Sequence, residues 1–258
     1  MLQETFHTPL PLELEVGIPS GDVEVETAEG EESNITVDGD DRLLEEVEIR
    51  QDGNRLVVAF RGKAKFGFSL SPLSLVFGSE LRVRATVPHG AGIKVKTASA
   101  DTRLDGHFGP VGVNSVSGDL RVRGEIAGNA SIKTVSGDAD LDRVEGDMSA
   151  QTVSGDLRIG PVAGSADTKT VSGDIRFQSV TAGDVRFTSV SGDVEIGIAH
   201  GSAVDVDAGS TSGDLSSEVP LASEPQPGDI AGEGDPEPPT VVLRGRTVSG
   251  DVKVFRAG

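Results

Sequence analysis

The chain of 258 residues contains no cysteine, no tryptophan and no tyrosine. Without cysteine, neither a disulfide framework nor a thiolate metal site can form. The core must therefore be built from Val, Leu, Ile, Ala and nine Phe, and a sugar-binding site would lack its usual aromatic platforms. The four histidines are scattered and fit no metal-ligand spacing; they are His7, His89, His107 and His200. We expect no metal and no cofactor.

Long apolar runs are missing too. No stretch approaches the roughly 18 apolar residues that a membrane-spanning helix needs. Residues 1–16 have neither a basic start nor a continuous apolar stretch, so they do not look like a signal peptide. We therefore expect a cytoplasmic protein, with the cell envelope as the alternative location.

Positive charge is scarce, since 42 acidic residues outnumber 23 Lys and Arg and the formal net charge is −19. Residues 13–52 carry fifteen acids and two bases, whereas residues 53–213 carry eighteen acids and seventeen bases. A nucleic-acid backbone is bound by clustered Lys and Arg. The charge distribution therefore argues against a nucleic-acid partner.

The common sequence signs of catalysis are absent. The chain has no Gly-x-Ser-x-Gly motif and no phosphate-binding loop of the Walker type. A glycosidase would need one distinctive pair of carboxylates, but here carboxylates recur at nearly every repeat. We predict that the protein is not an enzyme.

What the sequence does contain is a repeat. Thr-Val-Ser-Gly-Asp occupies residues 134–138, 152–156, 170–174 and 247–251, with near-copies at 115–119, 189–193 and 211–214. From Ser99 onward the Ser of these segments recurs in steps of 18, 19, 18, 18, 19, 21 and 37 residues. A fixed period of this kind indicates stacked coils.

Within each period, apolar residues stand two apart with charged residues between them, which is typical of half-buried strands. Residues 172–180 and 181–190 show the same pattern twice within one coil. The sequence therefore predicts an all-β, single-stranded β-solenoid (β-helix) with two-sided coils of about 18–19 residues. β-Branched residues and Gly recur too often for a helical alternative.

We interpret the Gly and Asp of each repeat as structural corners, because Gly tolerates strained backbone angles and Ser and Asp form local hydrogen bonds in turns. An Arg follows two residues after several of these Asp and predicts a cationic row beside them. Calcium binding is the alternative, as in glycine-rich nonapeptide repeats, although each corner offers a single Asp. The corner residues are Gly118, Asp119, Gly137, Asp138, Gly155, Asp156, Gly173, Asp174, Gly192, Asp193, Gly213, Asp214, Gly250 and Asp251.

Four regions are expected within one structural domain. Residues 1–90 would be an irregular N-terminal β region that continues the solenoid and caps one end, and residues 91–218 the regular repeat. Residues 219–240 would be an acidic loop rich in Pro and Gly, and residues 241–258 a terminal coil that closes the far end. Caps are expected because an exposed end coil offers unpaired strand edges.

Residues 61–80 differ from the rest, because apolar residues stand beside basic ones and residues 53–96 carry eight bases and one acid. Such a loop is typical of contact with a membrane surface or a partner. The alternative is a hairpin folded over the open end of the solenoid. The candidate contact residues are Arg61, Lys63, Lys65, Phe66, Phe68, Leu70, Leu73, Leu75 and Phe77.

Several motifs carry a family resemblance: the T-V-S-G-D corners, the F-x-T-P-x-P-L-x-L-x-V pattern of Phe6–Val16, the V-P-x-G of Val87–Gly90, and Arg246–Val254. In these the chain resembles the bacterial "putative adhesin" β-strand-repeat family, a domain of unknown function, over almost its whole length. The resemblance implies a β-solenoid, no known catalytic residues and, in some relatives, a link to the cell envelope or its stress responses.

These observations favour a non-catalytic scaffold or interaction protein, linked to the cell envelope or its stress response, that binds a protein partner through its outer faces or residues 61–80. Contact with a membrane surface is a further expectation for residues 61–80, beside their role as a cap. The alternatives are a surface-exposed adhesin-like module and a calcium-dependent repeat protein. The partner's identity and the oligomeric state stay open.

Overall fold

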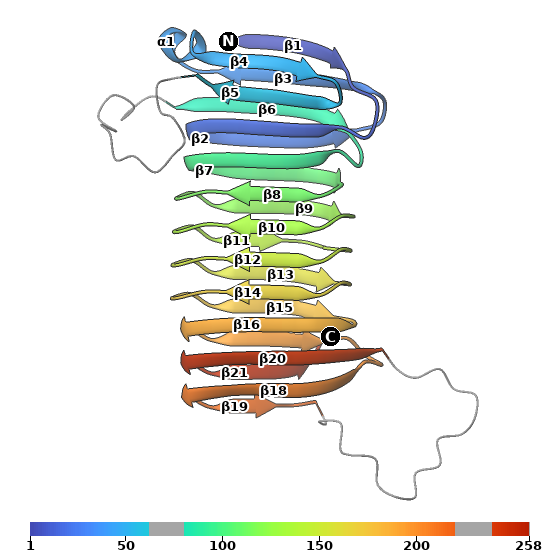
Figure 1. Cartoon of the computed structure of the whole chain (residues 1–258), viewed down its shortest axis with the longest axis vertical. Helices are drawn as coiled ribbons and strands as arrows, with labels where there is room; N and C mark the ends of the chain where they lie inside the picture. The colour runs from blue at the N-terminus through green and yellow to red at the C-terminus, as the bar shows by residue number, and fades with distance from the viewer. Residues whose placement is uncertain (62–79, 220–238, 258) are drawn as a thin grey trace, which may run out of the picture. The chain divides into compact units, whose positions relative to one another are not determined.

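The computed structural model of the chain describes residues 1–61, 80–219 and 239–257. Nearly all of its regular structure is β (Figure 1). The chain separates into two compact units, Met1–Asp138 and Ala139–Gly258. Among the described residues, no helix is long and apolar enough to cross a membrane. The expected boundaries after residues 90, 218 and 240 and the single domain stay predictions.

In the first unit the described elements are β1 (Leu2–His7), β2 (Glu13–Ala28), β3 (Glu32–Asp38), α1 (Asp41–Leu44), β4 (Val47–Asp52), β5 (Arg55–Phe60), β6 (Leu81–Pro88), β7 (Gly92–Phe108), β8 (Val111–Asn114), β9 (Leu120–Ile126) and β10 (Ala130–Lys133). In the second they are β11 (Ala139–Leu141), β12 (Met148–Gln151), β13 (Leu157–Val162), β14 (Ala166–Lys169), β15 (Ile175–Val180), β16 (Gly183–Ser191), β17 (Val194–Ile198), β18 (Ala203–Ser212), β19 (Leu215–Ser217), β20 (Thr240–Ser249) and β21 (Val252–Arg256).

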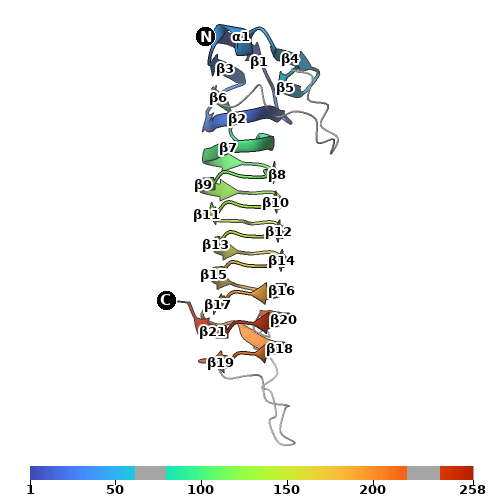
Figure 2. The same cartoon turned by 90° about the vertical axis from the view of Figure 1, so that its left-hand side faces the viewer.

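Each regular coil has two sides, and a strand on one side pairs in parallel with the strand one coil away. In the first unit β8 pairs with β10 and β7 with β9. In the second unit β13 pairs with β15 and β14 with β16. The two layers of strands are visible within each unit in Figure 2. The predicted two-sided β-solenoid is confirmed.

The core consists of inward-facing apolar columns that run from coil to coil. In the second unit Leu157, Ile175, Val194 and Val252 lie opposite one another in successive strands, and each is at most 1% exposed. Burying one such side chain contributes roughly 1.5–3 kcal/mol. The alternation of apolar and charged residues in the sequence therefore sets which side of each strand faces inward.

Strand β2, the second strand of the chain, is inserted between other strands of the first unit. One edge of β2 pairs in parallel with β7, and the other pairs with β5 and then β6. Beyond them β4 runs antiparallel to β5, β3 antiparallel to β6, and β1 antiparallel to β3. The predicted irregular N-terminal β cap is confirmed, and it is made of antiparallel strands.

The C-terminal strands β20 and β21 are inserted into the second unit. β20 pairs with both β16 and β18, and β21 pairs with both β17 and β19. The sequence order predicted that this coil closes the far end, but the pairings place it between two other coils. The outermost described coil of this unit is therefore β18 with β19. Basic β20 lies between strands that carry Asp184 and Asp207.

Candidate functional site

The corners of the coils require glycine for two reasons. Gly192 has a φ of 133°, in the left-handed region, and a Cβ there would lie 2.3 Å from the carbonyl oxygen of Gly173. Gly173 approaches Gly155, and Gly250 approaches Gly192, equally closely. Because the obstructing atom is backbone, a side chain at these corners would force neighbouring coils apart.

Each corner Asp connects two coils. Its backbone N–H donates a hydrogen bond to the carboxylate Oδ1 of the Asp in the neighbouring coil. In the first unit these bonds run from Asp119 to Asp101 (3.0 Å) and from Asp138 to Asp119 (3.1 Å). In the second they run from Asp174 to Asp156 (3.0 Å), Asp193 to Asp174 (2.9 Å), Asp251 to Asp193 (2.8 Å) and Asp214 to Asp251 (2.9 Å). These carboxylates therefore act as hydrogen-bond acceptors in a continuous Asp ladder within each unit.

Basic side chains lie beside the corners, but they pair in two ways. Arg158 donates to Asp156 of its own coil at 2.9 Å, whereas Arg176 pairs with Glu195 of the next coil at 3.0 Å. Within the described ranges, no group of three or more His, Asp or Glu could hold a metal ion. The described corners therefore provide no group of ligands that would support calcium binding.

Two histidines that seemed unrelated in the sequence come together in the first unit. The rings of His89 and His107 lie edge to face with their centroids 5.5 Å apart. The Thr27 hydroxyl lies 2.7 Å from Nδ1 of His89 and accepts the His107 backbone N–H at 2.9 Å. Their separation of 18 residues is one coil, and this signal could have revealed the pair.

Of the candidate contact residues in 61–80, only Arg61 lies within the described part of the chain. Its guanidinium binds the Glu48 carboxylate, and this hydrogen bond lowers the pKa of Glu48 and raises the pKa of Arg61. Lys63, Lys65, Phe66, Phe68, Leu70, Leu73, Leu75 and Phe77 lie outside the described residues. Their contact role stays a prediction.

A feature that the sequence reasoning missed is the outward direction of the Val in Thr-Val-Ser-Gly-Asp. Where the Thr or Ser that begins each repeat is buried or half-buried, the next Val is about half exposed and the following Ser is exposed. The exposed fractions are 53% and 46% for Val116 and Val135 in the first unit, and 46%, 47%, 46% and 52% for Val153, Val171, Val190 and Val248 in the second. Period-two alternation from the buried Thr could have predicted this.

In the second unit the four Val form one row, which we call the valine column (Val153, Val171, Val190 and Val248). The Ser that follow them pair in order from Ser154 through Ser172 and Ser191 to Ser249. Neighbouring members are therefore one coil, about 4.8 Å, apart. The column presents methyl groups and hydroxyl groups side by side along the corner.

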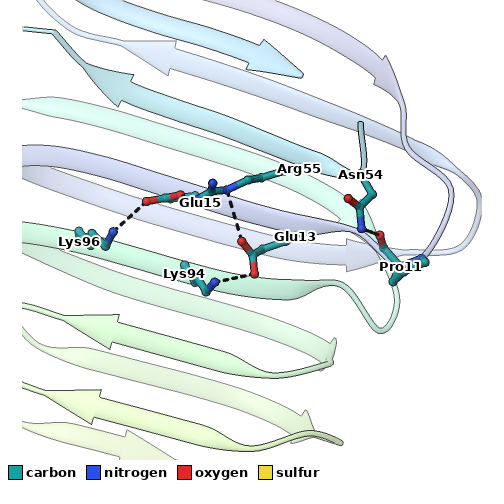
Figure 3. Close-up of polar contacts among 7 residues, drawn as sticks. All are labelled: Pro11, Glu13, Glu15, Asn54, Arg55, Lys94 and Lys96. Atoms are coloured by element: carbon teal, nitrogen blue, oxygen red, sulfur yellow. Dashed lines mark hydrogen bonds and ion pairs between the residues drawn. The ribbon is translucent and has the colours of Figure 1, made fainter. Parts of the chain in front are cut away.

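Charged side chains on the outer faces of the strands, away from the corners, form ion pairs between neighbouring strands. In Figure 3, Glu13 lies between Arg55 (3.4 Å) and Lys94 (2.7 Å), and Glu15 lies between Arg55 and Lys96 (3.0 Å). These pairs join β2 to β5 on one edge and to β7 on the other. They match the register of the inserted strand near its N-terminal end.

The sequence profile of the family described as Toastrack DUF4097 matches residues 12–255. No curated protein matches the chain. A "putative adhesin" from Bacteroides fragilis has a similar solved structure, with a TM-score of 0.58 at 12% identity, covering 98% of this chain and 96% of that one. A second from Parabacteroides distasonis has a TM-score of 0.53 at 13% identity, with the same coverage of 98% and 96%. These likenesses show the fold, and the family match shows that the chain belongs to the Toastrack DUF4097 family, a domain of unknown function.

Proposed function

We propose that the protein is a non-catalytic β-solenoid scaffold that binds a protein partner through the valine column, in association with the cell envelope. The observation that carries this proposal is the regular row of half-exposed Val153, Val171, Val190 and Val248. Single exposed apolar residues are ordinary, but a contiguous apolar row bordered by polar groups is typical of an interaction surface.

A non-catalytic role is supported by the corner carboxylates. From Asp156 to Asp251 these carboxylates accept backbone hydrogen bonds from the next coil, which is a structural role. The family is one of unknown function, and the similar solved structures carry the description of adhesins.

The test is a pull-down from native lysate and from a membrane fraction with the immobilised full chain. A variant with Val153→Thr, Val171→Thr, Val190→Thr and Val248→Thr keeps side-chain shape but replaces an exposed methyl by a hydroxyl at each site. A control with Gln178→Ser and Thr188→Ser changes exposed residues outside the column. We expect the column variant to lose the captured partner and the control to retain it, at equal melting temperature. Equal capture by both variants, or no specific capture by the parent, would contradict the proposal.

A surface-exposed adhesin-like module is the second candidate, favoured by the fold shared with the B. fragilis and P. distasonis structures. It differs from an intracellular scaffold in where the chain resides. Labelling intact cells with a membrane-impermeant amine reagent decides between them. Labelled Lys on intact cells would favour the adhesin-like module, and labelling only after lysis would favour the scaffold inside the cell.

A further inference from the structure

The outermost described coil of the second unit has one paired edge and one free edge. β18 pairs with β20 and β19 with β21, and no other described strand pairs with either. The Ala203 N–H donates to Pro239 on the β20 side. Because successive strand residues direct their backbone groups to opposite edges, those of Val204, Val206 and Ala208 face the free edge.

The apolar column of the core is exposed at this coil. Leu215 lies opposite Val252, in the same column as Leu157, Ile175 and Val194. Those four residues are at most 1% exposed, whereas Leu215 is 48% exposed. One further strand beyond β19 would therefore bury Leu215 as the other members of its column are buried.

The Asp ladder also ends with an open acceptor. Asp156, Asp174, Asp193 and Asp251 each accept a backbone N–H from the next coil. Asp214 donates its own N–H to Asp251, but its carboxylate accepts no hydrogen bond from the described residues. An incoming strand with an N–H at this corner would extend the ladder by one step.

Charge selects the kind of strand that fits. Asp207 is paired with Arg246 of β20, whereas exposed Asp205 has no ion-pair partner among the described residues. On the other edge of this coil, basic β20 lies between acidic groups, with Arg244 also 3.8 Å from Asp184. Pairing with the same edge of a second copy would bring Asp205 against like charge, on a chain whose net charge is −19.

We propose that the free edge of β18 and β19 is a docking site for an extended segment of a partner protein, in which Lys or Arg alternates with apolar residues. The segment adds in parallel beside β18, turns at the corner and continues beside β19, as in β-augmentation, with main-chain hydrogen bonds giving affinity and side chains giving selectivity. It pairs a base with Asp205, covers Leu215 and provides an N–H for Asp214. This docking site is separate from the valine column and does not depend on it.

The probe is a synthetic peptide with the sequence of residues 239–256, because this segment already pairs with β18 and β19 from their inner edge. The full chain is titrated with the peptide while amide hydrogen exchange is followed by NMR. We expect the amides of Val204, Val206 and Ala208 to exchange rapidly in the free protein and to become protected with the peptide. The amides of Asp205 and Asp207 already bond toward β20 and stay protected throughout.

Two matched changes test the charge requirement. A control peptide with Arg244→Glu and Arg246→Glu should bind at least about tenfold more weakly, which corresponds to about 1.4 kcal/mol. The protein variant Asp205→Lys should weaken the parent peptide about fivefold. Its melting temperature should equal that of the parent, because Asp205 has no ion pair to lose. Equal binding of both peptides would overturn the charge argument.

Three other results would overturn the proposal. Protection of Val204, Val206 and Ala208 in the free protein would mean that the edge is already covered. Sedimentation would then show whether a second copy or the same chain covers it. Loss of protection at Asp205 and Asp207 would mean that the peptide displaces β20 instead of adding beside β18. Absence of binding at millimolar peptide would mean that the edge does not dock strands of this chemistry.

Discussion

The two units end in different ways. The outer end of the first unit is covered by the antiparallel strands β1, β3 and β4, and Leu44 of α1 is buried there. β1 and β4 are only six residues long, which limits the length of exposed edge. The described outer end of the second unit is a single coil with a free parallel edge. The short antiparallel strands at the first end leave little edge for strand addition, whereas the ten-residue β18 leaves a longer free edge at the second.

Each unit contains a strand from near a chain terminus that is inserted between two others, β2 in the first unit and β20 in the second. The two inserted strands carry opposite charges. β2 is acidic and lies between basic strands, with Glu24 bound to Arg84 (3.0 Å) as well as the pairs at Glu13 and Glu15. β20 is basic and lies between acidic groups, with Arg246 bound to Asp207 (3.0 Å). Charge complementarity thus specifies a pairing between segments that are far apart in the sequence.

The largest effect is expected from comparing the two ends of one core column. Ile175→Ala should lower the free energy of unfolding by about 2–5 kcal/mol, because it opens a cavity between fully paired coils. Leu215→Ala should cost less than about 1 kcal/mol, because Leu215 is already half exposed at the open edge. Urea unfolding of both variants gives the comparison.

Equal losses for the two variants would show that the open end is buried in solution. The slope of the unfolding free energy against urea should be the same in both variants, so that a change in stability is not confused with a change in the unfolded state.

The next largest effect on stability concerns how closely the inserted strands β20 and β2 pack against their neighbours. A Cβ on Gly245 in β20 would lie 2.2 Å from the ring of Phe187, whereas a Cβ on Gly17 in β2 would meet nothing closer than 4.0 Å. Gly245→Ala should therefore cost about 1–3 kcal/mol through overpacking. Gly17→Ala should be neutral or stabilise by up to about 1 kcal/mol, since it restricts the unfolded chain. Thermal unfolding of the two variants measures the difference.

The control for this pair is a double-mutant cycle. In a Phe187→Ala background the ring is gone, so Gly245→Ala should cost less than about 0.5 kcal/mol. If its cost is the same with and without the ring, the fit between Phe187 and Gly245 does not hold β20 in place.

The regular part of this fold could be predicted from sequence because its information is local. A Gly and an Asp recurring every 18 or 19 residues mark the corners, and apolar residues two apart mark the buried sides. Each coil repeats the residue pattern of the previous one, so the period alone predicts which strands pair.

The insertions could not be read from the period, because they join segments 79 residues apart, such as Glu13 in β2 and Gly92 in β7. The available signal was charge: residues 13–52 are acidic and residues 53–96 are basic. Pairing these two blocks would have predicted the position of β2. The valine column was missed for another reason, since the repeat was interpreted as a corner without asking which way its Val points.

The smallest effect tests whether the two inserted strands depend on charge to the same degree. Glu15 is mostly buried and pairs with Arg55 and Lys96, so Glu15→Gln should cost about 1 kcal/mol in low salt. Arg246 and Asp207 are both mostly exposed, so Arg246→Gln should cost less than about 0.5 kcal/mol. The unfolding free energies should be measured at 0.05 M and 1 M NaCl. At 1 M the Debye length falls to about 3 Å, and the more exposed Arg246 pair should lose its contribution first. A Glu15 variant as stable as the parent at both salt concentrations would mean that the packing of Leu14 and Val16 alone places β2, and that the acidic and basic blocks of the sequence do not guide its insertion.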